Sequence, residues 1–495
     1  MSNKNMNVVI VAKDEIKALV SSLELLNKKS SSKDLINCIH FEIGLDGAGE
    51  KIKNKATITG EGRMLISCFY AKKPSDFSKG TLYGDFYVPV DSFLETVKKL
   101  LMFEEDLVFS VSGNKLLLSV SDDKARVSIA LVDENMVTAQ MPAIEEVASD
   151  AILTFQLKSE DFQKLTKGAA FLSAEHHGVS DKVEFAFNLE KGTLTAQTIG
   201  KASMAFASST IPIAFNPALE GRLKAFWRTQ NGLPAETPDD ASDEEKEAAA
   251  AKENACCPYT IFPIGMENFL IMSKFLGNSK NTCGISITPK YMTIISNGQI
   301  FMCTLNAIAH SLISMIEKKI LTRKRKSAIV VDADELNQAL SLITLAKTTG
   351  KNPQSIAKIQ VLQDKVRITF KSVKCDIKLI NLQSEDTAEH FAYISEDILS
   401  KYLSNLSKGN IYMEFTEDTV VQKTGAISKG PVILCNGDIE HQSREIFGII
   451  MPLQDSIAQK LEKQTEDEDT ESKTKGKSST EENDSSDTVE ETNNN

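Results

Sequence analysis

FQLKSEDFQKL, residues Phe155–Leu165, joins a strand pattern to a helix pattern. Apolar and polar side chains alternate up to Leu157, which predicts a strand with one buried face. After Ser159 the apolar side chains recur at helical spacing, at Phe162 and Leu165, and two acidic residues stand where the first turn of a helix favours them. The stretch therefore predicts a strand that runs directly into a helix.

The same junction occurs six times along the chain. In each repeat an apolar residue at the end of a strand precedes the first buried residue of a helix by five positions: Val11 and Ile16, Val88 and Phe93, Leu157 and Phe162, Ile264 and Phe269, Val331 and Leu336, Tyr393 and Ile398. The strand-end residues are separated by 77, 69, 107, 67 and 62 positions, and the long interval shortens to about 67 without an insertion of roughly 40 residues. Each repeat, a strand, a helix and about three strands, is too small to bury its own helix, so two repeats form one domain.

Three such domains are predicted in an α+β architecture, at residues 1–148, 149–326 and 327–455. The second domain is interrupted at about 216–257 by an acidic, Ala-rich and Pro-containing insertion, which we expect to be partly disordered. Residues 456–495 contain many charged and hydroxyl side chains and almost no large apolar ones, so we expect a disordered acidic tail.

The composition favours a soluble intracellular protein without a catalytic site. Of the 495 residues 41% are hydrophobic, which is enough for buried cores, and no apolar run reaches the ~18 residues needed to span a bilayer. The eight cysteines have no paired two-residue spacing, so neither a zinc site nor a disulfide framework is indicated. No metal-spaced histidine pair, glycine-flanked nucleophilic serine or isolated carboxylate pair stands out. We therefore expect a cytoplasmic protein that is not an enzyme and holds no metal or cofactor.

Acidic charge is concentrated outside the predicted domains. The chain has a formal net charge of −12, to which residues 456–495 contribute −7 (12 acids, 5 lysines) and residues 234–255 contribute −6 (8 acids, 2 lysines). The remaining residues therefore carry about +1. A body that is nearly neutral can present a basic face if its acids lie elsewhere, so the net charge does not exclude a nucleic-acid partner.

Six repeats of this composition, ending in a strand with Met451-Pro452, resemble the beta sliding clamp of bacterial DNA polymerase III. The resemblance covers about residues 1–453 outside the insertion. It implies a DNA-clamp fold in which three domains form half a ring, with helices lining the hole and sheets forming the outer wall. It also implies that two chains close the ring as a homodimer around double-stranded DNA without sequence preference. As a processivity factor in DNA replication, the ring would tether the replicative polymerase and be associated with the nucleoid.

The resemblance further implies a pocket between the second and third domains where DNA polymerases and clamp loaders bind through short peptide motifs. The family's terminal Met-Pro matches Met451 and Pro452, with Leu453 as the next apolar residue. The loop of the family's second domain matches Gly200 and Lys201. This loop lacks the family's Asp-Gly-His/Tyr-Arg run, and a polar, acidic ending replaces the family's basic and apolar one. Both departures concern the residues that select the peptide.

Lysines on the polar sides of the six predicted helices are the candidate DNA-facing residues. In the third helix Phe162, Leu165 and Ala169 form the apolar stripe, and two lysines lie off it. Lysine is a flexible point charge that suits a sliding contact with phosphates. The candidates are Lys17, Lys28, Lys29, Lys98, Lys99, Lys164, Lys167, Lys274, Lys280, Lys347, Lys351, Lys401 and Lys408.

Each of these signals has an alternative interpretation. Acids in the first turn and lysines in the last turn complement any helix dipole without a ligand, so the DNA hypothesis depends on six helices sharing one ring. Without the DNA contact, the same fold would be a scaffold that binds peptide motifs of partner proteins. The basic run Arg323–Lys326 is predicted to be a solvated interdomain linker rather than a DNA contact or a targeting signal. Trp227 is expected to pack beneath the insertion, although an exposed indole would favour a partner anchor.

Overall fold

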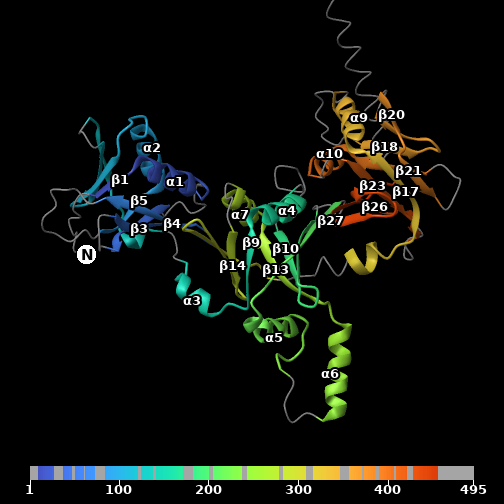
Figure 1. Cartoon of the computed structure of the whole chain (residues 1–495), viewed down its shortest axis with the longest axis horizontal. Coiled ribbons are helices and arrows are strands. Elements are labelled where there is room, and N and C mark those ends of the chain that lie inside the picture. The colour runs from blue at the N-terminus through green and yellow to red at the C-terminus, as the bar shows by residue number, and fades with distance from the viewer. Residues whose placement is uncertain are drawn as a thin grey trace, which may run out of the picture. The chain divides into compact units, whose positions relative to one another are not determined.

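The computed structural model (Figure 1) describes residues 9–26, 37–46, 51–60, 62–72, 84–120, 124–137, 141–170, 182–199, 205–236, 242–277, 282–307, 316–345, 356–370, 373–384, 390–405, 409–420, 427–454 and 457. The chain divides into two compact units. Unit 1 is Met1–Lys201 with Ala207–Lys318, and unit 2 is Ala202–Phe206 with Lys319–Asn495. Within the described ranges, no helix is both long and apolar enough to cross a membrane.

All six predicted strand-to-helix junctions are present. They are β1 (Val9–Val11) with α1 (Lys13–Glu24), β5 (Gly84–Pro89) with α2 (Val90–Leu100), β9 (Leu153–Lys158) with α4 (Ser159–Ala170), β13 (Tyr259–Gly265) with α7 (Met266–Gly277), β17 (Arg325–Asp332) with α9 (Ala333–Leu345), and β22 (His390–Ser395) with α10 (Glu396–Asn405). The helices pack in pairs, α1 with α2, α4 with α7, and α9 with α10 (Figure 1). Each pair therefore contains one helix from each of two consecutive repeats.

Burial confirms five of the six predicted residue pairs. Both members are buried in each of the first five pairs, with exposed fractions of 5% or less. The sixth pair is wrong by one position, because Ile398 is only partly buried whereas the next residue, Leu399, is fully buried. In α10 the apolar stripe is continued by Tyr402 and Leu403, and Leu399 lies on the same helical face.

Unit 1 contains a sheet of twelve strands that are antiparallel to their neighbours. Its main path is β8-β7-β6-β1-β4-β16-β15-β14-β9, and β2, β3 and β5 extend it beside β4. The strands not yet given bounds are β2 (Cys38–Asp46), β3 (Lys51–Gly60), β4 (Arg63–Lys72), β6 (Leu107–Ser112), β7 (Lys115–Val120), β8 (Arg126–Ala130), β14 (Thr282–Ile287), β15 (Tyr291–Ser296) and β16 (Gln299–Thr304). The turns of the two hairpins β6-β7 and β15-β16 contain positive φ angles at Gly113, Asn297 and Gly298, which glycine and asparagine tolerate.

The pairing of β4 with β16 joins the first two predicted domains within unit 1. Its register runs from Gln299 opposite Ser67 to Cys303 opposite Arg63. The short helix α3 (Ile144–Ser149) covers this junction, because Val147 packs with Met64 and Met302. A 3₁₀ turn at Glu134–Met136 precedes α3. The connection between these domains is therefore a packed element and a continuous sheet.

Aromatic side chains fill the core of unit 1. In the first repeat pair Phe41 lies 5.1 Å from Phe93 and 6.2 Å from Phe109, measured between ring centroids. In the second, Phe185 lies 6.5 Å from Phe162 of α4 and 5.9 Å from Phe269 of α7. Phe185 belongs to β10 (Lys182–Asn188), which pairs with β13 and with β11 (Thr193–Ile199), the neighbour of β12 (Ala205–Pro212). Helix α4 thus packs on strands of its own repeat and against α7 of the following repeat.

Unit 2 contains two further sheets around α9 and α10. One follows the order β27-β26-β23-β17-β21, and the other follows β20-β19-β18-β22. The new strands are β18 (Ile356–Val361), β19 (Lys365–Phe370), β20 (Val373–Lys378), β21 (Asn381–Ser384), β23 (Asn410–Thr416), β26 (Val432–Gly437) and β27 (Gln442–Ile450), with a small ribbon of β24 (Thr419–Val420) and β25 (Ile427–Ser428). Arg325 and Lys326 begin β17, so the C-terminal half of the run predicted to be a linker is part of a strand.

Two helices occupy the described parts of the insertion, whose partial disorder stays a prediction. Helix α5 (Glu220–Gln230) follows a 3₁₀ turn at Pro217–Leu219, and α6 (Asp243–Ala255) follows α5. The Phe226 ring of α5 stacks on Phe262 of β13 at 5.9 Å between centroids. The Gln230 side chain donates to the carbonyl of Ile261 at 2.8 Å and accepts from its N–H at 3.0 Å, satisfying backbone groups of β13. Tertiary contacts with the sheet therefore stabilise a segment whose composition favours disorder.

Candidate nucleic-acid interface

Seven of the thirteen candidate DNA-facing lysines lie within the bounds of α1, α2, α4, α7 and α10. In α4 the predicted stripe of Phe162, Leu165 and Ala169 is buried, and Lys164 is exposed. The opening prediction for this helix is therefore confirmed at these positions. Because an amphipathic helix must bury its apolar stripe, its lysines are left toward solvent, where they can contact a polyanion.

The structure describes the side chains of five of the thirteen candidates, and all five are exposed: Lys17, Lys98, Lys99, Lys164 and Lys274. Lys167 lies in α4 and Lys401 in α10. The other six candidates lie outside the described residues: Lys28, Lys29, Lys280, Lys347, Lys351 and Lys408. In the sequence these six come after the described ends of α1, α7, α9 and α10.

Acidic neighbours pair with four of the five exposed lysines. The pairs are Lys17 with Asp14, Lys99 with Glu95, Lys164 with Asp161, and Lys98 of α2 with Glu24 of α1. In the first three the distance from Nζ to the carboxylate oxygen is 3.5, 2.7 and 3.5 Å respectively. The hydrogen bond from Lys99 lowers the pKa of Glu95. Exposed pairs of this kind are weak, so a phosphate can replace the carboxylate at small cost.

The six helices carry more acidic than basic charge. Within their bounds they contain twelve Asp and Glu residues and eight Lys residues, a balance of −4. Only α2, α4 and α7 are balanced, and α9 has no basic residue. The residues within the described helix bounds therefore supply no net positive potential.

The predicted peptide-binding segment Met451-Pro452-Leu453 follows β27 in unit 2 and is partly buried. The N–H of Leu453 donates to the carbonyl of Tyr393 at 2.9 Å, and its side chain packs against Ile356 and Tyr393. Gly200 and Lys201, the residues matched to the other wall, lie outside the described residues. The segment is thus held in a fixed place beside β22.

An aromatic and basic surface adjoins this segment, and the sequence did not indicate it. Phe391 and Tyr393 lie two positions apart on β22 and therefore on the same face, with their ring centroids 5.9 Å apart. The Lys358 Nζ lies 4.7 Å from the Phe391 centroid, and the Lys429 Nζ lies 5.1 Å from it. The strand pattern at Phe391 is the only sequence signal, because Lys358 reaches it from the neighbouring strand β18. Aromatic rings flanked by cations offer both apolar contact and charge to a bound peptide.

Two buried thiols and the metal-ligating residue types were the remaining candidates for chemistry. The described residues include no group of three or more His, Cys, Asp or Glu side chains that could hold a metal ion. Burial raises the pKa of the Cys303 thiol to about 12 and that of Cys38 to about 11. Both thiols are therefore protonated at neutral pH, and a protonated thiol is a poor nucleophile.

Comparison with solved structures identifies proteins of similar fold. The DNA polymerase III beta subunit of Thermotoga maritima is 14% identical, with 90% of this chain and 99% of that chain covered and a TM-score of 0.63. The DNA polymerase sliding clamp of Bacillus subtilis is 15% identical, with 91% and 100% covered and a TM-score of 0.63. The Helicobacter pylori beta clamp, solved bound to a DNA ligase peptide, is 12% identical, with 90% and 100% covered and a TM-score of 0.62. No protein-family model and no curated protein matches the sequence.

At 12–15% identity these likenesses concern the fold and leave residue roles open. They extend over about nine tenths of this chain and essentially all of each solved chain, so they include all six strand-to-helix repeats. The chain has the DNA-clamp fold of the DNA polymerase III beta-subunit sliding clamps.

Proposed function

We propose that the protein is a sliding clamp that encircles duplex DNA and tethers a replicative DNA polymerase. The observation that carries the proposal is the likeness to sliding-clamp structures along nearly the whole of both chains. A likeness of this extent preserves the number of repeats, and three two-repeat domains per chain are what a ring of two chains needs. The proposed assembly is therefore a homodimer with the helices toward the hole.

Topological enclosure explains how such a protein holds DNA without binding it tightly. A closed ring leaves duplex DNA only at an end, so the contacts inside it need not be strong. Lysine side chains pair with phosphates of any sequence, and each such contact is weak enough to exchange as the ring moves. The protein performs no reaction in this role, and a separate loader must open the ring on DNA without ends.

Partner proteins would bind through short peptide motifs at Met451-Pro452-Leu453. A solved clamp of the same fold carries a DNA ligase peptide, which supports this kind of partner. The partly buried apolar segment and the adjoining Phe391 and Lys358 provide apolar contact and positive charge for such a motif. The proposed partners are the polymerase and the clamp loader.

Lysine neutralisation tests the DNA contact. Replacing Lys98, Lys99, Lys164 and Lys167 with Gln should weaken DNA binding and reduce the dependence of log K on log salt concentration by up to about 4. The measurement is fluorescence anisotropy with a duplex labelled at one end, repeated over a series of salt concentrations.

Four exposed lysines that lie outside the helices provide the matched control: Lys115, Lys191, Lys374 and Lys378. Their replacement with Gln removes the same charge and should leave the salt dependence close to that of the unchanged chain. If both quadruple variants behave alike, the helix lysines do not contact DNA. The fold would then serve as a scaffold for peptide motifs.

A further inference from the structure

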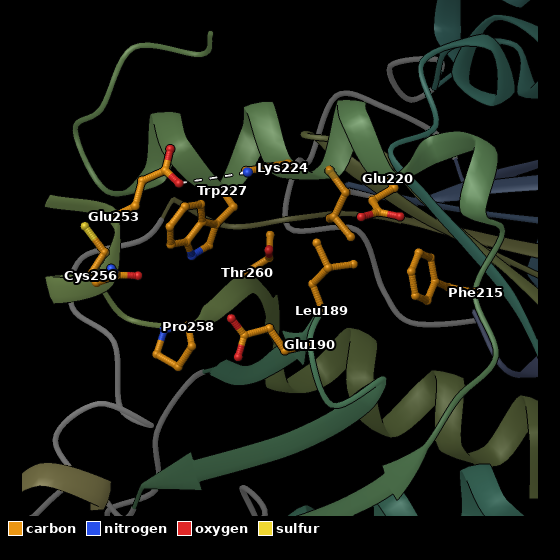
Figure 2. A pocket seen from close by; sticks show the side chains of 12 residues that line it. Leu189, Glu190, Phe215, Glu220, Lys224, Trp227, Glu253, Cys256, Pro258 and Thr260 are labelled. Atoms are coloured by element: carbon orange, nitrogen blue, oxygen red, sulfur yellow. Dashed lines mark ion pairs between the residues drawn. The ribbon is translucent and has the colours of Figure 1, made fainter. Parts of the chain in front are cut away.

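A cavity of about 520 Å³ lies beside the insertion in unit 1, between α5 and the turn that follows β10 (Figure 2). Apolar side chains from three separate segments line it: Leu189, Phe215, Leu223 and Trp227. Figure 2 shows Leu189 and Thr260 in the middle of the cavity, with Trp227 at one end and Phe215 at the other. Trp227 is the only tryptophan of the sequence.

The walls of this cavity are fixed by contacts that do not depend on a ligand. The indole Nε1 of Trp227 donates to the carbonyl of Cys257 at 2.7 Å, which sets the ring plane. Leu223 of α5 is fully buried, and Arg222 of the same helix donates to the carbonyl of Ser149 at 3.0 Å. With the contacts to β13 described above, these bonds attach α5 on several sides. A cavity with such walls exists before any ligand binds, which lowers the entropic cost of binding.

Carboxylates dominate the charge around the cavity. Glu190 and Glu220 are exposed and line it, and neither has an ion-pair partner in the part of the chain that the structure describes. Glu253 already pairs with Arg228 at 2.7 Å, and its second oxygen lies 3.9 Å from Lys224. Over residues 216–257 the insertion holds nine acids and five bases, a balance of −4. The site therefore combines an apolar floor with a negative rim.

We propose that this cavity docks an extended segment of a partner protein that carries a bulky apolar side chain next to an arginine or a lysine. The apolar side chain enters between Leu189, Phe215 and Trp227, and the basic group pairs with Glu190 and Glu220 at the rim. DNA and the acidic residues 456–495 both carry the charge that this rim repels, so charge complementarity favours a basic partner over either. The site is separate from the predicted segment at Met451 and does not depend on ring formation.

Fluorescence of Trp227 gives a direct readout, because no other tryptophan contributes. The probes are synthetic octapeptides in a Gly-Ser background that contain one Phe or Leu and one Arg or Lys, one to four positions apart. A matched set has Glu in place of the basic residue. We expect the basic set to change the emission of the full chain saturably, and the acidic set to leave it unchanged. A failure of every basic peptide, or equal binding of the two sets, would overturn the proposal.

The variant pair Glu190→Gln and Glu220→Gln removes the rim charge without disturbing the buried contacts. It should lower the affinity for the basic peptides by roughly three- to tenfold, consistent with the loss of two exposed ion pairs. The control pair Glu236→Gln and Glu244→Gln removes two exposed acids of the insertion that do not line the cavity, and should bind like the unchanged chain. Equal binding by all three proteins would contradict the assigned role of the rim.

Photo-crosslinking separates the possible occupants. With a benzoylphenylalanine at position 189 of the full chain, we expect crosslinks to the basic peptides. Crosslinks to residues 456–495 of the same chain, or to a second copy of the protein, that persist in excess peptide would assign the cavity to those occupants instead. Either result would overturn the proposal.

Discussion

Gly448 of β27 lies where α10 presses a tyrosine ring against the sheet. A Cβ at this position would come within 2.4 Å of Cε2 of Tyr402. The ring cannot easily retreat, because it is fully buried and its hydroxyl donates to the carbonyl of Leu434 at 2.6 Å. In the last repeat, α10 therefore packs directly on the backbone of β27. This close approach requires a glycine at position 448.

Gly448→Ala should lower the free energy of unfolding of unit 2 by about 1–3 kcal/mol, the usual cost of forcing extra volume into a packed core. Differential scanning calorimetry of the full chain measures the change as a lower transition temperature. Gly284→Ala in β14 is the control, since a Cβ there meets nothing within 4 Å. Its effect should stay within about 0.5 kcal/mol. Equal effects of the two substitutions would contradict the proposed clash.

Cys303 provides a second prediction at this scale. Its thiol is fully buried, and burial raises the pKa to about 12 from the usual 9.0. Iodoacetamide at pH 8 should therefore alkylate Cys303 only after denaturation, whereas the partly exposed Cys256 should react in the folded chain. Peptide mapping by mass spectrometry measures both reactions. Rapid labelling of Cys303 under native conditions would show that the β4-β16 junction opens.

The raised pKa of Cys303 also makes the stability of the folded chain depend on pH. Because the pKa of Cys303 is higher in the folded chain, the contribution of this thiol to the free energy of unfolding is fully present below pH 9. Between pH 9 and about 12 the unfolded chain releases this proton and the folded chain retains it, so stability falls as pH rises.

At the scale of elements, α6 is capped at its first turn, in addition to the ion pair of Glu253 with Arg228 near its other end. None of its residues is buried, and isolated helices of 13 residues are marginal in water. The Ser242 hydroxyl accepts from the N–H of Glu245 at 3.3 Å, and the Glu245 carboxylate accepts from the N–H of Ser242 at 2.9 Å. These reciprocal bonds form a capping box, and the hydrogen bonds that the carboxylate accepts from the N–H and hydroxyl of Ser242 lower the pKa of Glu245 from its usual value of 4.5.

Ser242→Ala should destabilise α6 by about 1 kcal/mol and speed amide hydrogen exchange across residues 243–255 roughly fivefold. Hydrogen-exchange mass spectrometry measures this. Glu244→Gln, in the same turn but outside the capping box, is the control. Because the pKa of Glu245 is lowered in the helix, its contribution is present above pH 4.5 and is lost as the pH falls further. Unchanged exchange in Ser242→Ala would indicate that other contacts hold α6.

The repeating junctions could be predicted because their signal is local. A change from alternating to helical spacing within eleven residues, as in Phe155–Leu165, already specifies which side chains face the core. The error at Ile398 came from counting a fixed offset, whereas burial in α10 is decided by contacts with the sheet. Helix α5 could not be predicted in this way, since its stability comes from Phe262 and Ile261, more than thirty residues further along the chain.

At the scale of the whole molecule, counting lysines overestimated the positive charge of the helices. The sequence correctly placed Lys164 on the exposed face of α4, but the acid one turn earlier, Asp161, lies on that face too. The helix dipole favours acids at the first turn of every helix, so each lysine face brings its own counter-charge. In the proposed ring, basic residues outside the described helix bounds would therefore supply much of the attraction for DNA.

Ring formation requires two chains. Sedimentation equilibrium should give a species of twice the chain mass, because one chain supplies only three of the six domains of the proposed ring. The experiment should cover a range of concentrations that includes micromolar protein. A monomer that persists throughout that range would exclude a closed ring of two chains and leave the scaffold interpretation.

The central claim is tested most directly by the dependence of DNA retention on DNA ends. The protein is loaded with a clamp loader onto a nicked circular plasmid, and its retention is followed by gel filtration in buffer salt high enough to suppress direct lysine-phosphate binding. Enclosure predicts that the protein stays on the circle and leaves within minutes when a restriction enzyme cuts it. Equal retention on circular and linear DNA, or rapid loss from both, would contradict a sliding clamp.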